Sequence, residues 1–148
     1  MAAKDKEAQV PASFKLKIDG KESAGLFKEA TGFDSESEVS ELKRTLPNGR
    51  TEVVKAAGNT MWSDIELKRG VDTDKSLWNW RKLVVDGKLD HARKDCTVTM
   101  LDYEGTPIVT YSIINAWPKK YTGASLKADS NEVAVEGITL CHEGFEIQ

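Results

Sequence analysis

The chain has 148 residues, 39% of them hydrophobic, which predicts one globular domain with a single apolar core. Its 21 Lys and Arg residues nearly balance 24 Asp and Glu residues, and the formal charge of -3 excludes a general electrostatic attraction to nucleic acid or anionic membranes. The sequence shows neither a secretory signal nor an apolar run of the roughly 20 residues that span a bilayer. We therefore expect synthesis in the cytoplasm without a signal peptide, no membrane anchoring, and thiols at Cys96 and Cys141.

The first strand is expected directly after a polar N-terminal segment. Residues 1–12 are polar and include Pro11, which predicts a flexible arm, and residues 13–148 are predicted to form the single domain. From residue 13 onward, apolar and polar residues alternate as in a strand with one face in water. The apolar face would carry Phe14, Leu16 and Ile18, and the polar face Lys15, Lys17 and Asp19.

The next part of the chain is predicted to contain further strands around a long connection. Residues 24–33 suit a strand, and the acidic residues 36–44 suit an extended edge strand. Residues 45–61 contain Pro47 and an Asn-Gly pair, which indicates a hairpin tip or a long loop. Alternation resumes over residues 61–70, where another strand is expected.

A single helix is predicted over about residues 74–86. Asp72 or Thr73 would cap its free amides, and Gly87 would take the left-handed conformation that ends it. Residues spaced at i, i+3 and i+7 form an apolar stripe that is expected to pack against a sheet. The stripe contains Leu77, Trp80, Leu83 and Val84, whereas Trp78 and Arg81 lie off it.

Two β-rich segments follow the helix and predict a hairpin. Residues 95–103 and 107–117 are joined by the turn-forming sequence Glu-Gly-Thr-Pro. In residues 131–144 the apolar positions change from odd to even numbers at Gly137. This change predicts a β-bulge at the glycine, because one extra residue turns every later side chain to the other face.

The sequence offers little that could carry chemistry. His91 and His142 lack the spacing to the two cysteines that a zinc site needs, and no phosphate loop or nucleophile elbow is present. Glu36 and Glu38 suit a solvated strand face better than acid-base catalysis. Residues 117–121 mix aromatic residues with only two lysines, too few for a nucleic-acid surface. We therefore expect no catalytic residues, no metal and no cofactor.

Several segments together resemble one protein family along most of the chain. In order, these segments are AGLFKEATGFDSESEV, IELKRGV, LWNWRK, INAWPKKY and SNEVAVEGITLCHEG. They resemble the inner-tube proteins of contractile phage tails and contractile injection systems, over roughly residues 14–145. The resemblance implies a mostly β fold in which two packed antiparallel sheets form a small barrel or sandwich with one flanking helix. This is the fold of the type VI secretion tube proteins.

The same resemblance implies a structural function. Such proteins form hexameric rings that stack into a hollow tube, and contraction of a surrounding sheath drives the tube through a target envelope. The implied partners are further copies of the chain, a sheath protein, and baseplate hub and terminator proteins. Cargo effectors or phage DNA would occupy the lumen. The chain would be assembled into a phage tail or an injection particle, within the cytoplasm or released from the cell.

The resemblance also suggests which residues meet other subunits. The loop of residues 45–61 would lie against a neighbouring subunit or the next ring, which would cover its apolar side chains. Helix residues off the apolar stripe are available for further contacts. The interface residues expected on this basis are Leu46, Pro47, Val53, Val54, Trp78 and Arg81. The residues that could line the channel are Lys15, Lys17 and Asp19, although the sequence leaves open which polar strand face points inward.

Two alternatives of other kinds remain from the sequence. A small β-barrel of this size can enclose a ligand, so a ligand-binding module is one of them. A baseplate hub protein of the same fold, which would cap the tube instead of forming its length, is the other.

Overall fold

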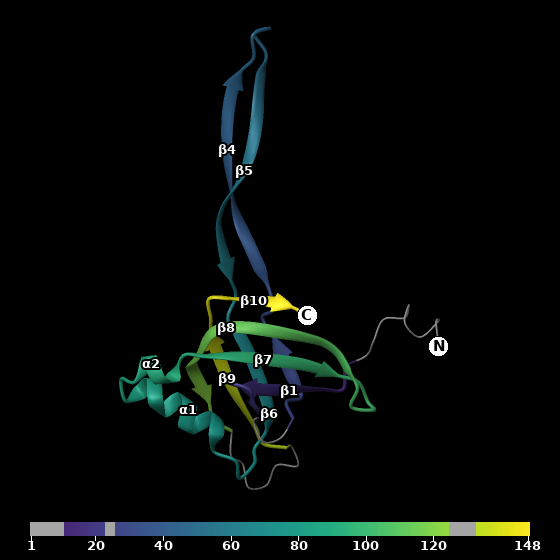
Figure 1. Cartoon of the computed structure of the whole chain (residues 1–148), viewed down its shortest axis with the longest axis vertical. Helices are drawn as coiled ribbons and strands as arrows, with labels where there is room; N and C mark the ends of the chain where they lie inside the picture. The colour runs from purple at the N-terminus through teal and green to yellow at the C-terminus, as the bar shows by residue number, and fades with distance from the viewer. Residues whose placement is uncertain (1–10, 23–25, 125–132) are drawn as a thin grey trace. The chain divides into compact units, whose positions relative to one another are not determined.

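The computed structural model describes residues 11–22, 26–124 and 133–148 and consists largely of antiparallel β-structure (Figure 1). It divides into a barrel unit, Met1–Gly32 with Asp64–Gln148, and a hairpin unit, Phe33–Ser63. Of the arm expected over residues 1–12, all but the last two residues lie outside the described residues.

The first sheet of the barrel unit follows the alternation that the sequence predicts. Its strands are β1 (Ser13–Ile18), β2 (Lys21–Glu22), β7 (Lys94–Leu101), the first half of β8 (Pro107–Thr122) and β10 (Gly144–Ile147). They pair in the order β2-β1-β7-β8-β10, all antiparallel. Leu16 of β1 opposes Val98 of β7, so the apolar faces meet on one side. The hairpin expected between residues 95 and 117 is confirmed as β7 and β8.

The second sheet shares β8 with the first. It contains β3 (Glu29–Thr31), β6 (Ile65–Gly70), β9 (Val135–Cys141) and the second half of β8. β8 passes from one sheet to the other at Asn115, whose φ of 49° is left-handed. The backbone N–H of Asn115 donates to the Asp95 carboxylate at 3.0 Å, and its side-chain amide donates to Glu143 at 2.7 Å. These bonds hold the bend in place.

A short bridge closes the two sheets into a barrel. Phe14 of β1 and Phe27, just before β3, exchange two backbone hydrogen bonds of 2.8 Å. Of the strand expected over residues 24–33, the described part, residues 26–33, forms Glu29–Thr31, preceded by this bridge. The interior is filled by side chains from both sheets that are at most 2% exposed: Leu16, Phe27, Ile65, Leu67, Cys96, Val98, Ile113, Ile138 and Leu140.

The helix packs against β8 with the apolar stripe that its sequence predicts. α1 runs from Ser76 to Val85 and is followed by the short α2 (Leu89–Ala92). Leu77 and Trp80 are buried, and the Trp80 indole N–H donates to the Ala92 carbonyl at 2.6 Å. The expected cap at Asp72 or Thr73 is wrong. Asp74 accepts the Ser76 backbone N–H at 3.1 Å instead, because it lies one or two residues closer to the first free amides.

The β-bulge expected at Gly137 is also wrong. β9 pairs with β6 without interruption, and Gly137 opposes Lys68 in regular register. The even-numbered core positions start at Glu136, a buried charged residue that sequence analysis did not select. The irregularity lies in the partner strand β8, between Pro118 and Lys120.

The hairpin unit is a long two-stranded ribbon. β4 (Ser35–Thr45) pairs with β5 (Thr51–Trp62), so most of the predicted connection of residues 45–61 is strand and the turn covers residues 46–50. The Gly49 N–H donates to the Leu46 carbonyl at 2.9 Å, and Gly49 has a φ of 83°. The register shifts near Gly58, where an added Cβ would lie 3.2 Å from that of Glu38. A bulge of this kind strengthens the twist of the two strands, which is visible in Figure 1.

Candidate assembly surfaces

The hairpin unit leaves apolar side chains in water. Every residue of β4 is exposed, and in β5 only Glu52 is half-buried. The large apolar side chains that are at least 36% exposed here are Val39, Leu42, Val53, Val54, Met61 and Trp62. A two-stranded hairpin without a covered apolar face is marginally stable in water. Such a ribbon is therefore suited to being ordered and covered by another protein surface.

The interface residues expected in this segment lie in two places. Leu46 and Pro47 are in the turn, half-buried and exposed respectively. Val53 opposes Lys43, whereas Val54 opposes Leu42, and adjacent strand residues point to opposite faces. The structure therefore separates the two valines and gives each face of the ribbon one of them. Leu42, which sequence analysis did not select, completes the apolar pair with Val54.

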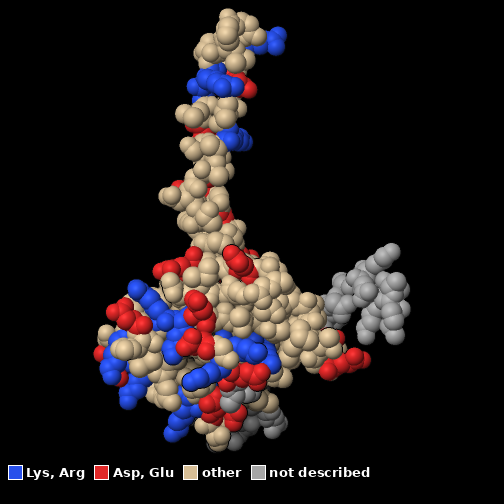
Figure 2. Space-filling model, in the orientation of Figure 1, with Lys and Arg blue, Asp and Glu red and all other residues tan. Residues whose placement is uncertain are grey.

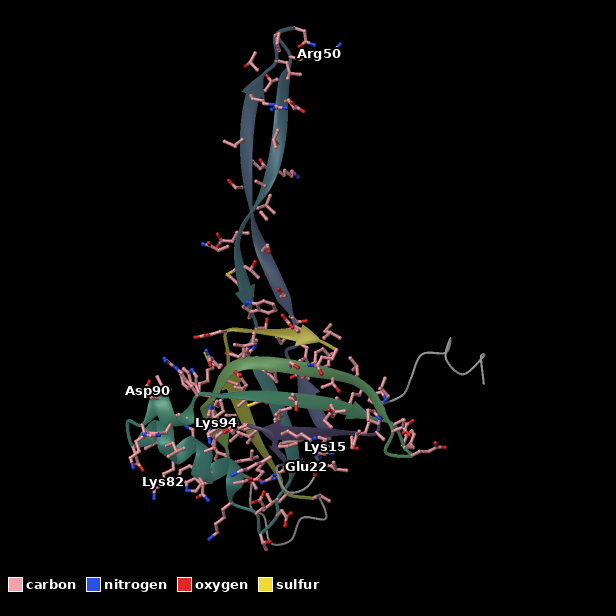
Figure 3. The ribbon with its side chains drawn as sticks, in the orientation of Figure 1. Lys15, Glu22, Arg50, Lys82, Asp90 and Lys94 are labelled. Carbon is pink, nitrogen blue, oxygen red and sulfur yellow. The ribbon has the colours of Figure 1, made fainter. Side chains whose placement is uncertain are left out.

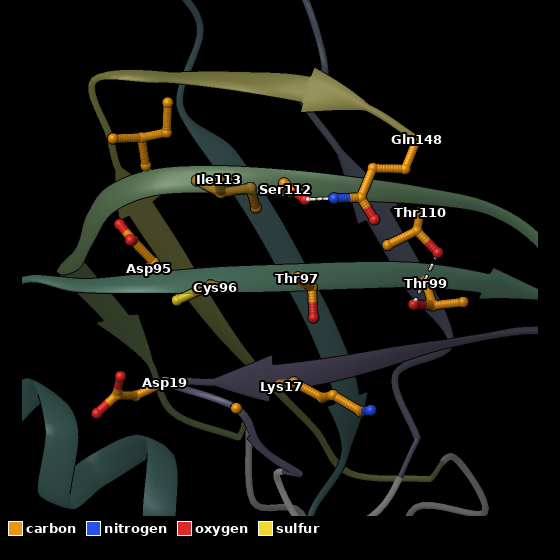
Figure 4. Close-up of a pocket in the computed structure, with 12 residues that line it drawn as sticks. Lys17, Asp19, Asp95, Cys96, Thr97, Thr99, Thr110, Ser112, Ile113 and Gln148 are labelled. Atoms are coloured by element: carbon orange, nitrogen blue, oxygen red, sulfur yellow. Dashed lines mark hydrogen bonds between the residues drawn. The ribbon is translucent and has the colours of Figure 1, made fainter.

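The outer face of the first sheet carries an open polar groove of about 610 Å³ (Figure 4). Hydroxyl groups line its floor, because alternate residues of β7 and β8 at this face are Thr or Ser. Thr99 and Thr110 hydroxyls lie 3.3 Å apart, and the Gln148 amide donates to the Ser112 hydroxyl at 2.6 Å. The groove can therefore offer hydrogen bonds to a polar surface without a strong net charge.

Two of the three expected channel residues line this groove. Lys17 and Asp19 belong to its wall. Lys15 lies two residues before Lys17 in β1, and its Nζ forms an ion pair of 2.5 Å with the Glu22 carboxylate (Figure 3). The hydrogen bond and charge of Lys15 hold the pKa of Glu22 below its ordinary value. The structure thus brings Lys17 and Asp19 together and engages Lys15 in a surface ion pair.

The two expected contact residues of the helix differ in exposure. The Trp78 side chain is 45% exposed, and its ring meets the Tyr121 ring edge-on at 5.4 Å between centroids. Arg81 is half-buried. Trp78 therefore already contributes to packing within the barrel unit and leaves about half of its surface for another contact.

A buried charge cluster joins the helix start to the second sheet, and sequence analysis missed it. Arg69 of β6 is 2% exposed, and its Nε donates to Glu136 of β9 at 2.7 Å. Its two terminal nitrogens each donate to Asp74 at 3.2 Å, one to the carboxylate and one to the backbone carbonyl. The guanidinium carbon also lies 5.6 Å from the centre of the Phe27 ring. The alternation of the strand could have revealed it, because Arg69 occupies the next core-facing position after the buried Ile65 and Leu67.

Hydrogen bonds within this cluster shift two pKa values. The Tyr121 hydroxyl donates to Glu136, and this bond, together with burial, raises the pKa of Tyr121. Burial acts to raise the pKa of Asp74, but hydrogen bonds from Ser76 and the neighbouring Arg69 outweigh it and hold that pKa below its ordinary value. The cluster therefore favours charged Asp74 and neutral Tyr121 near neutral pH.

The described residues offer no grouping typical of catalysis or metal binding. Among them, no three His, Cys, Asp or Glu side chains are placed to hold a metal ion. Cys96 and Cys141 are free thiols, and burial raises the pKa of Cys96 to about 12, which makes it a poor nucleophile. No helix within the described ranges is long and apolar enough to cross a membrane.

The barrel unit is a closed β-barrel with one packed helix, and the hairpin unit is an exposed ribbon suited to contact with other proteins. Residues 10–146 match the family of the T4-like virus tail tube protein gp19, and the chain belongs to this family. The fold class expected from the sequence is confirmed, as is the family resemblance. The family is one of tail tube proteins.

Solved structures share the fold over nearly the whole chain. A chain in the sheath-tube complex of PVC, an extracellular contractile injection system in its extended state, has 23% identity and a TM-score of 0.73, covering 97% of this chain and 93% of that one. The tube-terminating cap of the anti-feeding prophage has 24% identity and a TM-score of 0.66, covering 100% and 99%. Hcp1 from Flavobacterium johnsoniae has 15% identity and a TM-score of 0.53, covering 91% and 94%. No curated protein sequence matches the chain.

Proposed function

We infer that the chain is the repeating subunit of the inner tube of a phage tail or contractile injection apparatus. The observation that carries this proposal is the exposed ribbon of β4 and β5, within a chain that belongs to the tail tube family. In the tube, hexameric rings stack into a hollow conduit for cargo or DNA, and a contracting sheath drives the conduit through a target envelope. Leu46, Pro47, Val53 and Val54 contact a neighbouring subunit or the next ring.

The partners follow from the same proposal. A PVC chain of this fold occurs in a sheath-tube complex, and others occur at tube ends. By analogy, this chain binds further copies of itself, a sheath protein, a terminator and a baseplate hub. Trp78 and Arg81 are the helix residues proposed for these contacts, because Trp78 stays 45% exposed beside Tyr121 and Arg81 is only half-buried.

Electron microscopy tests the proposal directly. Negatively stained particles that contain the chain, and concentrated purified protein, are expected to show rings and hollow tubes. Antibody labelling should place the chain along the whole tube. A native particle without a tube, together with a monomer at every protein concentration, would contradict the proposal.

The polar groove is the surface best suited to line the conduit. Its hydroxyl floor, with Lys17 and Asp19 of opposite charge at the wall, forms a hydrated surface of low net charge along which cargo can slide. Lys15 extends this face but is held by Glu22. Sequence analysis left open which polar strand face lines the conduit. Because of the groove, we propose the face of the first sheet that points away from the barrel core.

Labelling of a cysteine at position 17 tests this orientation. In a Cys141→Ser background, Lys17→Cys should be the reactive thiol, because Cys96 is buried and weakly nucleophilic. A small biotin maleimide can enter the conduit, so it should label this cysteine in rings and tubes alike. Streptavidin should bind the biotinylated cysteine in separated rings but not along intact tubes, whose walls would exclude it. Equal streptavidin binding along intact tubes would place the groove on the outside.

A terminator at the end of the tube is the second candidate. The anti-feeding prophage cap matches the full length of this chain with identity similar to that of the PVC tube match. Quantitative mass spectrometry of whole particles separates the candidates. A tube subunit occurs in every tube ring of a particle, whereas a terminator or hub occurs in only one ring. A ligand-binding barrel has less support, since buried side chains fill the barrel interior.

A further inference from the structure

The hairpin unit carries its unmatched charges at opposite ends. Two cross-strand ion pairs lie in the half next to the turn, Lys55 with Glu41 at 3.9 Å and, close to the turn itself, Arg44 with Glu52 at 2.8 Å. The remaining charged side chains of the ribbon form no ion pair within the described ranges. The acidic ones are Asp34, Glu36 and Glu38 at the start of β4, and the basic ones are Lys43 and Arg50 near the turn. Figure 2 shows Lys and Arg gathered over the part of the ribbon next to the turn, and Figure 3 places Arg50 at the turn itself.

The two charged ends are too far apart to neutralise each other within one chain. Glu36 and Lys43 lie in the same strand, and at about 3.3 Å per residue roughly 23 Å separates them. Screening at physiological ionic strength acts over about 8 Å. Each end therefore interacts mainly with whatever lies beside it in another molecule.

The charge pattern distinguishes two ways of placing a second copy of the same ribbon. Two copies side by side at equal height would set Glu36 and Glu38 against the same acidic residues, which repel. A copy displaced along the ribbon by about the separation of the two ends would set its Lys43 and Arg50 against Glu36 and Glu38, which attract. The displaced contact joins different surfaces of identical chains and can repeat without closing, as a filament requires.

We propose that the basic end of one hairpin unit binds the acidic end of the hairpin unit of a second copy displaced along it, and that these charges set the axial register of ring stacking. The inference rests on the proposed tube function. The exposed apolar pair Leu42 and Val54 lies between the two ends, on the ribbon face opposite to that of Lys43, and offers further contact area to a neighbouring copy. Charges of this exposed kind fix register and select the partner, while apolar burial supplies most of the affinity.

Charge reversal at each end tests the proposal. The acid-end variant is Glu36→Lys/Glu38→Lys, and the basic-end variant is Lys43→Glu/Arg50→Glu. Each variant alone should raise the critical concentration for tube growth about tenfold or more, because every stacked contact becomes repulsive. Rings of the two variants mixed in equal amounts should form tubes again at a concentration close to wild type. Tube growth is measured by sedimentation and electron microscopy, from native tube fragments as seeds.

The swapped ion pair Glu41→Lys/Lys55→Glu is the matched control, since it reverses two charges but leaves both ends unchanged. It should form tubes as the wild type does. Raising the salt from about 0.1 M to about 1 M, which shortens the screening length from about 10 Å to about 3 Å, should raise the critical concentration for tube growth while rings persist.

The results separate this inference from the tube function. The inference about register would be wrong if either variant formed tubes at the wild-type critical concentration, or if the mixture grew no better than either variant alone. The proposed tube function would still stand. Recovery on mixing also shows that the variants are folded. If seeded wild-type chain forms no tube, the proposed function fails and the inference fails with it.

Discussion

Replacement of residues 38–59 by Asn-Gly is expected to abolish tube formation and leave the barrel unit folded. The replacement closes a short hairpin on the paired residues Ser37 and Thr60, whose hydroxyls lie 3.1 Å apart. The deleted strands bury no side chain, so the chain loses little apolar burial. Thermal unfolding should shift by no more than about 4 °C, the change that about 1 kcal/mol produces in a domain of this size. Sedimentation and electron microscopy should show no tubes.

Two paired substitutions make the same test without a deletion. Leu42→Ser/Val54→Ser removes the apolar cross-strand pair and should weaken tube growth strongly. Thr45→Ser/Thr51→Ser changes the neighbouring exposed pair with little loss of apolar surface and should leave growth unchanged. Normal tube yield from the shortened chain would show that the ribbon has no role in assembly.

The substitution Arg69→Met is expected to destabilise the barrel unit by about 3–5 kcal/mol, because it leaves the buried carboxylate of Glu136 without its cation. The double variant Arg69→Met/Glu136→Leu removes both charges and should recover most of that loss. Denaturant unfolding measures both changes. Arg44→Met is the matched control, since the Arg44 side chain is 63% exposed and its pair is worth at most about 1 kcal/mol. Equal losses in the single and double variants would mean that Arg69 acts through packing alone.

The same cluster sets the pH dependence of stability. The pKa of Asp74 is lowered in the folded chain, so its contribution is present above the ordinary carboxyl pKa near 4 and is lost as the pH falls through the folded value. The pKa of Tyr121 is raised, so its contribution is complete below about pH 10 and is lost at higher pH. Asp74→Asn should flatten the acid limb of an unfolding-pH curve, and Tyr121→Phe the alkaline limb.

Sequence periodicity predicts the elements that pack against the core. Alternation in β1 and the i, i+3, i+7 stripe of α1 are local patterns, and the structure buries Leu16, Leu77 and Trp80 as they predict. The extent of β4 and β5 was not predictable in this way. Both faces of that ribbon meet water, so its sequence has no apolar alternation to mark the strands.

Two features of the barrel depend on contacts between distant parts of the chain. Arg69 and Glu136 occupy core-facing positions, yet each alone has the sequence character of a surface residue, and only their pairing makes burial favourable. Closure through Phe14 and Phe27 depends on two backbone hydrogen bonds that no local pattern encodes. The proposed assembly residues are similar, because a surface that another molecule covers would gain its order from that molecule.

The continuity of β8 bears on how the barrel withstands force. One uninterrupted strand, Pro107–Thr122, belongs to both sheets and turns between them at Asn115. A pull applied to either layer therefore reaches the other along covalent bonds, while the flanking ladders of hydrogen bonds are strained together in shear. The two layers cannot slide apart without unzipping neighbouring strands on both sides of the bend. This arrangement would suit the proposed tube, which must stay intact when the sheath drives it through an envelope.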